Sequence, residues 1–354
     1  MSKLYTPYTV KDLTLPNRII MPPMCMYQAV DGKVQSWHKV HYASRAVGGV
    51  GLIIVEATGV CPEGRITDDC LGLWNDELLE YHKELVTLVH ELGGKIAIQL
   101  NHAGRKSTVS DITPEAPSAI AYDDESLTPT EMTVKEIEET VWEFKWAADR
   151  AKKAGYDAVE IHAAHGYLLS EFLSPCTNTR TDQYGGSIEN RVRFAGEVLA
   201  AVSEVWPDEK PIFIRISAED YEANGNHAAD LAEAINLIKD IGNGIDVVDV
   251  STGGVTPTAP KAYPGYQLSH AQVIRQETGL DVIGGGLILS AQAANGALIG
   301  EFVDADGDTT DDREIDLVYL GRELLRNPYL PLLGAKELGD DVAWPSSYER
   351  AKPR

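Results

Sequence analysis

Two histidines and a tyrosine lie close together in the segment His162-Ala-Ala-His165-Gly-Tyr167. Two imidazoles three residues apart could bind a metal ion, but such a site needs a third or fourth ligand of clear type. In their neutral form the same imidazoles could donate hydrogen bonds to a substrate oxygen, with Tyr167 as a proton source. We favour this second interpretation over a metal site, because the polar residues expected nearby, Gln99 and Arg215, are poor partners for a cation.

Polar side chains are expected at one rim from three neighbouring strands. Three short hydrophobic segments carry their polar residues in a single phase of the strand alternation: 95–100, 158–162 and 212–217. That phase holds Gln99, His162 and Arg215. A packed interior would not contain an amide, an imidazole and a guanidinium without a polar ligand to satisfy them. We therefore expect these side chains to converge on a ligand; the alternative is a buried polar network without one.

Glycines end two further hydrophobic segments, at Gly284-Gly285-Gly286 and at Gly321-Arg322. Backbone N–H groups at glycines can approach an anion closely, and an arginine can bind it through two parallel hydrogen bonds. Barrel proteins commonly hold a phosphate at this point of the fold. The pattern indicates a phosphate site; the alternative is a simple turn from strand to helix.

The cysteines do not form a metal or disulfide pattern. The chain has four, without a C-x-x-C pair: Cys25, Cys61, Cys70 and Cys176. Buried, unreactive thiols are the ordinary interpretation. Cys25 differs because it follows the first predicted strand, in Pro23-Met24-Cys25-Met26-Tyr27, and so belongs to the same rim as the polar side chains.

Strands and helices that alternate along the chain must position these residues. Eight short segments, most of them β-branched, are predicted as strands: 18–21, 51–57, 95–100, 158–162, 212–217, 246–251, 281–285 and 316–320. Amphipathic segments between them predict helices, among them 77–92, 134–154, 188–205 and 230–241. This alternation implies a parallel sheet. Eight units in 354 residues favour an α/β fold in which residues 1–354 form one (β/α)8 TIM barrel domain, with ligands at the C-terminal ends of the strands.

Two segments fall outside this alternation. Residues 4–17 combine turn signals with alternating apolar residues and predict a β-hairpin lid on the N-terminal mouth of the barrel. Residues 301–314 form an acidic insert before the last strand. A calcium loop starting at Asp304 would need glycine and glutamate where Thr309 and Ile315 stand, so a solvated acidic loop is the better interpretation.

Composition excludes several classes of partner. The formal net charge is −23, from 31 basic and 54 acidic residues, so the surface repels nucleic acid and anionic membranes. No run of about 18 apolar residues predicts a membrane span. The first residues lack the basic-then-apolar order of a signal peptide. We expect a cytoplasmic protein with neither nucleic-acid nor membrane partners.

Together the motifs resemble the Old Yellow Enzyme family, in its thermophilic-like bacterial branch, over nearly the whole chain. The segments that carry the resemblance are 23–27, 99–105, 162–167, 174–191, 215–217 and 321–326. The run NTRTDQYGGSIENR at 178–191 is very specific. Cys25 supports the bacterial branch, because the yeast and plant branch usually has threonine there.

The resemblance implies an FMN cofactor, and no metal, at the rim. The residues that it assigns to the flavin are Pro23, Met24, Cys25, Ala57, Gln99, His162, Arg215, Gly285, Gly286, Gly321 and Arg322. In this assignment Gly286 and Arg322 hold the phosphate, Arg215 lies near the N1–O2 side of the ring, and Cys25 lies near O4. Gln99 bonds the pyrimidine edge.

The resemblance also implies an activity, that of an ene-reductase which uses NAD(P)H to reduce α,β-unsaturated carbonyl compounds by a ping-pong mechanism. His162 and His165 would polarise the substrate carbonyl, Tyr167 would protonate the α-carbon, and Tyr27 would help to position the substrate. The protein would be a homodimer or a dimer of dimers, with Arg350 reaching the neighbouring subunit's site. A disordered tail is the alternative for Arg350.

Three other functions remain as alternatives. A phosphosugar aldolase or isomerase would need a Schiff-base lysine or a carboxylate base at the mouth, and the predicted strand ends offer no such lysine. A flavin-storage protein would not need a proton donor at Tyr167. A relative with an iron–sulfur cluster would need clustered cysteines, which this chain lacks.

Overall fold

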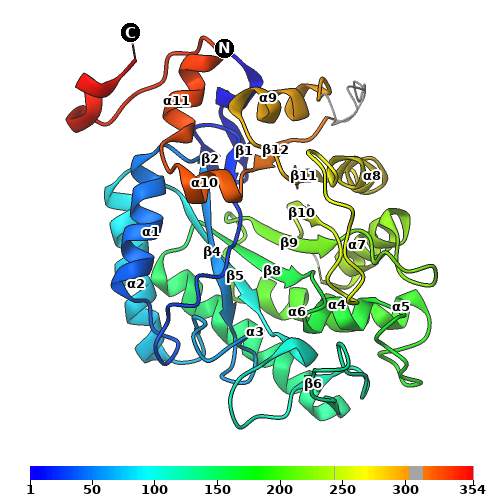
Figure 1. Cartoon of the computed structure of the whole chain (residues 1–354). Helices are drawn as coiled ribbons and strands as arrows, with labels where there is room; N and C mark the ends of the chain where they lie inside the picture. The colour runs from blue at the N-terminus through cyan, green and yellow to red at the C-terminus, as the bar shows by residue number, and fades with distance from the viewer. Residues whose placement is uncertain (243, 303–313, 354) are drawn as a thin grey trace.

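The computed structural model describes residues 1–242, 244–302 and 314–353, and its centre is a closed barrel of parallel strands (Figure 1). Around the barrel the order is β3-β4-β5-β8-β9-β10-β11-β12, and β12 pairs with β3 to close it. The strands are β3 Ile19–Met21, β4 Leu52–Gly59, β5 Ile96–Asn101, β8 Ala158–Ala163, β9 Ile212–Ser217, β10 Val247–Ser251, β11 Asp281–Gly284 and β12 Leu317–Tyr319. The predicted (β/α)8 TIM barrel is thus confirmed.

Helices surround the barrel and cover its outer face (Figure 1). The longer ones are α1 Ser36–Val47, α2 Asp76–Glu91, α3 Val134–Ala154, α6 Arg193–Ser203, α7 Ala228–Gly242, α8 Leu268–Thr278, α9 Ala291–Ile299 and α11 Leu330–Glu337. Short elements complete the connections: α4 Leu168–Leu173, α5 Ile188–Arg191, α10 Arg322–Arg326, η1 Lys3–Tyr5, η2 Gly104–Lys106, η3 Ser346–Ala351, β6 Glu115–Ala116 and β7 Thr130–Glu131. The predicted helix 188–205 is wrong in one respect, because it is divided into α5 and α6 at Val192.

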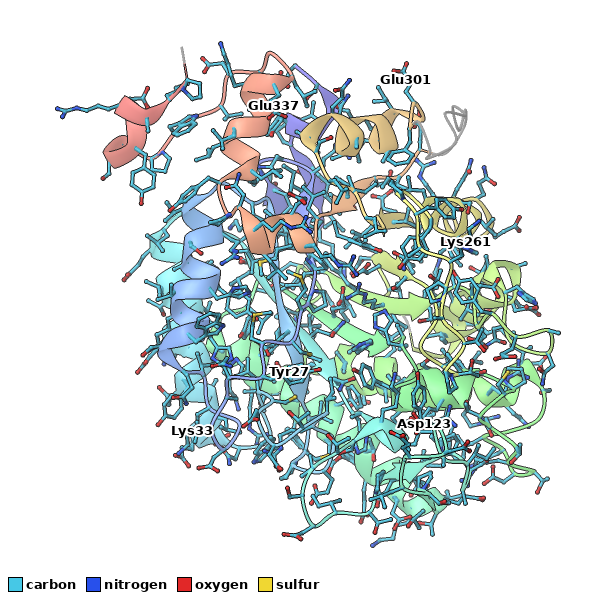
Figure 2. All side chains as sticks on the ribbon, viewed as in Figure 1. Tyr27, Lys33, Asp123, Lys261, Glu301 and Glu337 are labelled. Carbon is cyan, nitrogen blue, oxygen red and sulfur yellow. The ribbon has the colours of Figure 1, made fainter. Side chains whose placement is uncertain are left out.

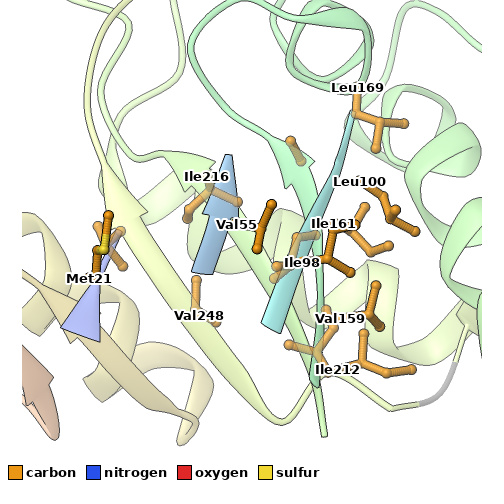
Figure 3. Packing of buried hydrophobic residues seen from close by; sticks show 14 of the residues in the cluster. Met21, Val55, Ile98, Leu100, Val159, Ile161, Leu169, Ile212, Ile216 and Val248 are labelled. Atoms are coloured by element: carbon orange, nitrogen blue, oxygen red, sulfur yellow. The ribbon is translucent and has the colours of Figure 1, made fainter. Parts of the chain in front are cut away.

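Strand alternation sorts the core into two layers. Side chains such as Ile98, Val159 and Ile212 pack outward between strands and helices (Figure 3). Ala97 and Phe213, in the opposite phase, pack inside the barrel. Gln99 and Arg215 follow these two residues in the same inward phase, which is why the polar residues meet inside the barrel.

The predicted N-terminal hairpin is present. Strands β1 Tyr8–Val10 and β2 Leu13–Leu15 pair antiparallel. Tyr8, Leu13 and Leu15 belong to the same apolar cluster as the side chains inside the barrel, and the Tyr8 hydroxyl donates to Asp281 Oδ2 at the start of β11 over 2.7 Å. The hairpin therefore closes the N-terminal mouth and leaves the other end for ligands.

Two further predictions concern segments away from the mouth. Most of the acidic insert, residues 303–313, lies outside the described residues, so the interpretation as a solvated loop stays a prediction.

Among the helices in the described part of the chain, none is both long and apolar enough to cross a membrane.

Candidate active site

Gln99, His162 and Arg215 meet inside the barrel, as the strand phases predict. His162 and Arg215 are register neighbours on β8 and β9, and Gln99 on β5 pairs with Glu160 on β8. The Gln99 amide donates to Glu160 Oε1 over 2.8 Å. The Arg215 guanidinium is buried, and its Cζ lies 5.7 Å from the centre of the Tyr319 ring. The three side chains thus belong to one polar interior.

His162, His165 and Tyr167 form a compact group just beyond the end of β8. The His162 ring meets the rings of His165 and Tyr167 edge to face, with centroids 5.2 and 4.9 Å away. His162 Nδ1 accepts the Ala164 N–H over 3.2 Å, which leaves the proton of the neutral ring on Nε2. Burial lowers the pKa of both histidines well below the ordinary value, and nearby positive charge, including Arg215, lowers it further. Both rings are neutral donors at neutral pH.

The backbone holds His165 in an unusual conformation. Its φ is +59°, in the left-handed region that costs a residue with a side chain free energy and often occurs at functional sites. Ser217 Oγ accepts the His165 N–H over 2.9 Å, and Ser251 Oγ lies 2.7 Å from His165 Nε2. These contacts from β9 and β10 fix the ring beside His162.

Lys106 is part of this group, although it lies at none of the predicted strand ends. Its Nζ donates to the carbonyls of His165 and Gly254 over 3.0 and 3.2 Å, and lies 5.4 Å from the centre of the Tyr167 ring. Burial lowers the Lys106 pKa to about 8. Strand phase could not place Lys106, because it lies in η2, five residues beyond the end of β5, where strand phase gives no direction.

Cys25, Ala57 and Tyr167 share a small apolar cluster at the rim. Burial raises the pKa of the Cys25 thiol well above its ordinary value, so the group is neutral. Burial also raises the Tyr167 pKa, which keeps its phenol protonated. Tyr27, on the loop between β3 and α1, is 43% exposed and has a φ of +51° (Figure 2). The loop after β3 thus brings its thiol to Tyr167.

Glu56, which was not among the predicted site residues, binds the loop after β3 through its carboxyl group. Its Oε2 accepts the Met26 N–H over 2.8 Å, and its Oε1 accepts the Tyr42 hydroxyl over 3.1 Å. The side chain is fully buried, and burial raises its pKa to about 7. Strand phase did not identify it, because the register of β4 against β5 shifts between Val55 and Thr58, so the alternation set by Leu52 and Ile54 does not continue to Glu56.

A Glu56→Gln variant is expected to gain stability relative to the parent as pH rises from 5 to 8. The folded protein keeps the Glu56 proton up to about pH 7, whereas the unfolded chain loses it near pH 4.5. Stability contributed by this group is therefore present below pH 4.5 and is lost as pH rises through 7. Urea unfolding at several pH values should show a relative gain of at most about 3 kcal/mol. A difference that stays constant or falls with pH would contradict this.

Two of the glycine segments line a cavity of about 210 Å³ beside the group of His162, His165 and Tyr167. Gly286, Gly321, Arg215 and Arg322 all line it. Gly286 has a φ of +98°, and a Cβ there would come within 2.9 Å of the Tyr266 ring. A cavity with two guanidinium groups and a glycine backbone at its wall offers hydrogen-bond donors and positive charge to an anion such as a phosphate.

Of the other predicted site residues, Met24 and Pro23 lie near this cavity, whereas Gly285 and Arg350 do not line it. Met24 lies beside this cavity, because a Cβ added to Gly321 would approach its Sδ to 3.7 Å; Pro23 precedes it, half-buried. Gly285 does not line the cavity; a Cβ there would meet the Tyr319 ring at 2.5 Å. Arg350 lies exposed in η3, in the C-terminal segment drawn in red beyond α11 (Figure 1). The structure does not bring Arg350 to the mouth of its own barrel.

Two more inward residues complete the interior and were not named as site residues. Asp249 on β10 lies 3.2 Å from Arg215 Nε, and Glu160 is fully buried beside it. The alternation of Val247, Asp249 and Ser251 along β10 would have placed Asp249 inward. In the part of the chain that the structure describes, no three His, Cys, Asp or Glu side chains are grouped so as to hold a metal ion.

Comparisons with known proteins identify the family. The family model described as NADH:flavin oxidoreductase / NADH oxidase matches residues 3–340. The NADPH dehydrogenase of Clostridium acetobutylicum is 50% identical over 351 residues, 99% of both chains. The NADPH dehydrogenase of Geobacillus thermodenitrificans is 52% identical over 350 residues, 98% of both chains.

Solved structures share the barrel. Morphinone reductase in complex with tetrahydroNAD is 32% identical, with a TM-score of 0.76 over 97% of this chain and 92% of that one. A 2-naphthoyl-CoA reductase has a TM-score of 0.85 at 24% identity, which shows the fold alone; this chain spans about half of its length, 52%. The chain therefore belongs to the NADH:flavin oxidoreductase / NADH oxidase family, the Old Yellow Enzyme family that its motifs resemble, and is an oxidoreductase.

Proposed function

We propose that the protein is an FMN-dependent ene-reductase that uses NAD(P)H to reduce the activated C=C bond of α,β-unsaturated carbonyl compounds in a ping-pong cycle. The observation that supports this most is the neutral group of His162, His165 and Tyr167 next to a cavity lined by Arg215, Arg322 and Gly286. An anion-binding cavity and a hydrogen-bond-donating pocket then lie on one rim. NADPH as the donor is supported by the names of the two dehydrogenases.

The residues fit a flavin mononucleotide. Arg322 and the Gly286 backbone would hold the phosphate, and Arg215 would supply a fixed positive charge to the ring. Gln99 donates its amide to Glu160, so its carbonyl oxygen is left to accept from the pyrimidine edge. Pro23, Met24, Cys25, Ala57, Gly285, Gly321 and His162 would complete the binding site. The bound flavin would accept hydride from the nicotinamide and pass it to the substrate β-carbon.

The pocket residues would act on the substrate oxygen and on one proton. His162 Nε2–H and His165 would donate hydrogen bonds to the carbonyl as negative charge develops on it. Tyr167 would deliver its phenolic proton to the α-carbon, and Tyr27 would hold the substrate from the exposed side. Lys106, a cation beside the Tyr167 ring, would stabilise the phenolate left behind.

A His162→Ala variant is expected to lose about 10²- to 10³-fold in kcat/KM for 2-cyclohexenone. The loss should appear in both kcat and KM, because the imidazole would bind the carbonyl in the ground state and more strongly in the transition state. Steady-state kinetics with NADPH measure this. The control is His90→Ala on the outer helix α2, which should change kcat/KM little. A His162→Ala loss below about threefold would exclude the proposed role.

The overall proposal is tested by colour and by two anaerobic reactions. Purified protein should carry a yellow flavin spectrum, NADPH should bleach it, and 2-cyclohexenone should restore it. A protein that is bleached by NADPH but not re-oxidised by the enone is a flavin carrier or acts on other acceptors. A colourless protein that takes up no added FMN would contradict the proposal.

The lowered pKa of Lys106 is the one observation that favours an aldolase, because a lysine that forms a Schiff base has a lowered pKa. Its Nζ, however, donates to two backbone carbonyls and lies against the rings of Tyr122 and Tyr167. With a pKa of about 8 it stays mostly protonated at neutral pH and is not a nucleophile. The family membership also favours flavin chemistry.

Assembly and location are part of the same proposal. We propose that residues 1–354 act as one FMN-binding barrel domain, in a homodimer or a dimer of dimers. Arg350 would reach the partner's pocket in such a dimer, which its exposed position in η3 allows. The cytoplasmic location stays a prediction of the sequence.

A further inference from the structure

Two carboxyl groups lie against each other inside the barrel, one level below the proposed flavin site. Glu160 on β8 and Asp249 on β10 are both fully buried. On one side the Gln99 amide donates to Glu160 Oε1, and on the other Arg215 Nε lies 3.2 Å from Asp249 Oδ2. Four neighbouring strands, β5, β8, β9 and β10, therefore contribute one residue each to a continuous chain.

The pair needs a proton to be satisfied. Within the described chain, no donor of good geometry reaches Glu160 Oε2 or either oxygen of Asp249. The two carboxyl groups face each other as acceptors and can form a hydrogen bond only if one carries a proton. Two ionised carboxylates beside one guanidinium in a dry interior would leave an uncompensated charge, which is costly. One shared proton leaves a single negative charge opposite Arg215.

The surrounding groups do not supply another charge. Burial raises the pKa values of Glu160 and Asp249, as expected for a pair that holds a proton. Tyr319 on β12 and Cys25 after β3 also face Arg215, and burial raises their pKa values, so they are neutral. The lowered pKa values of His162 and His165 keep both rings uncharged. Among these groups, Arg215 is the one cation, and it contacts both the carboxyl pair and the cavity.

We propose that Glu160 and Asp249 form a proton-accepting pair that takes up a second proton when flavin bound in the adjoining cavity is reduced. This inference rests on the proposed function. Hydride from the nicotinamide would add two electrons, one proton and one net negative charge to a bound flavin ring. That charge would compete with Asp249 for the positive charge of Arg215, so the less stabilised Asp249 carboxylate would take one proton from solvent. When the hydride passed to the substrate, Arg215 would again neutralise Asp249 alone, and the pair would return the proton to solvent.

The test is the pH dependence of the flavin reduction potential between pH 6 and 8. Uptake of two protons per two electrons changes the reduction equilibrium about a hundredfold per pH unit, which is about 59 mV. We expect this slope in the parent protein. In the double variant Glu160→Gln/Asp249→Asn no carboxyl of the pair remains to take the second proton, so the slope should fall toward about 30 mV per pH unit. An unchanged slope in the double variant would overturn the inference, because the second proton would then reside on the flavin.

Two controls keep the outcome interpretable. Glu143→Gln on α3 removes a carboxyl whose pKa burial also raises to about 7, but which lies outside the barrel against Cys61; it should keep the parent slope. FMN fluorescence should show that each variant still binds flavin. If the parent binds none, the proposed function and this inference fail together; if it binds flavin and the double variant Glu160→Gln/Asp249→Asn keeps the parent slope, only the inference fails.

A measurement on the unmodified protein covers the case in which the double variant does not fold. Infrared difference spectra between oxidised and reduced protein should show the carbonyl stretch of a newly protonated carboxylic acid. A parent protein that shows no such gain on reduction would also overturn the inference.

Discussion

Replacing Tyr167 with phenylalanine is expected to slow the reduction of an enone by about 10²- to 10⁴-fold, the usual contribution of a positioned general acid. Burial raises the pKa of this phenol, so it holds its proton until the substrate develops negative charge. Its ring is fixed edge to face against His162 and packs with Cys25 and Ala57, so the variant should keep the shape of the site. The effect should be confined to protonation.

Measuring the two half-reactions separately shows which of them depends on Tyr167. Bleaching of the flavin by NADPH needs no proton from Tyr167 and should stay within a few-fold of the parent rate. Re-oxidation by 2-cyclohexenone should carry nearly the whole loss. Tyr81→Phe is the matched control, since Tyr81 lies on the outer helix α2 near Lys33. Equal slowing of both half-reactions, or none, would show that Tyr167 is not the proton donor.

Replacing Arg322 with alanine is expected to weaken FMN binding by about 10- to 100-fold. A hydrogen bond between a guanidinium and a phosphate contributes roughly 1.5–3 kcal/mol, and each 1.4 kcal/mol is a factor of ten in Kd. Arg322 begins α10 at the wall of the cavity that also contains Gly286 and Gly321. Titration of the flavin-free protein with FMN, followed by fluorescence, gives the Kd.

Two comparisons isolate the phosphate contact. Arg326→Ala removes an arginine from the same helix whose side chain pairs with Glu323, and it should leave the FMN Kd nearly unchanged. Riboflavin, which lacks the phosphate, should bind the parent and Arg322→Ala equally. A similar loss of affinity for both flavins would mean that Arg322 contacts the ring or supports the fold instead.

The barrel and much of its interior were predictable because side chains alternate regularly along β5, β8 and β9. Once β5, β8 and β9 were identified, the phases of Ala97 and Phe213 fixed the inward direction of Gln99 and Arg215. The apolar phase of the same strands predicted the packing of Ile98 and Val159 against the helices. Strand ends are therefore where sequence reasoning places side chains best.

Residues in loops and at strand irregularities were harder to place from the sequence, for a physical reason. Lys106 reaches Tyr167 from η2, through backbone carbonyls of residues 165 and 254 that are distant in sequence. Glu56 lies where the register of β4 shifts, so its contact with Met26 depends on this irregularity and on the path of the loop after β3. Tertiary hydrogen bonds of this kind have no local signature in the sequence.

A crystal structure of the protein with FMN and a phenol bound would show directly whether one rim of the barrel binds the cofactor and activates the substrate. We expect the flavin phosphate within hydrogen-bond distance of the Gly286 backbone and Arg322, and the phenol oxygen at His162 and His165. A flavin bound elsewhere, or a phenol oxygen away from both histidines, would show that this rim does not combine the two roles.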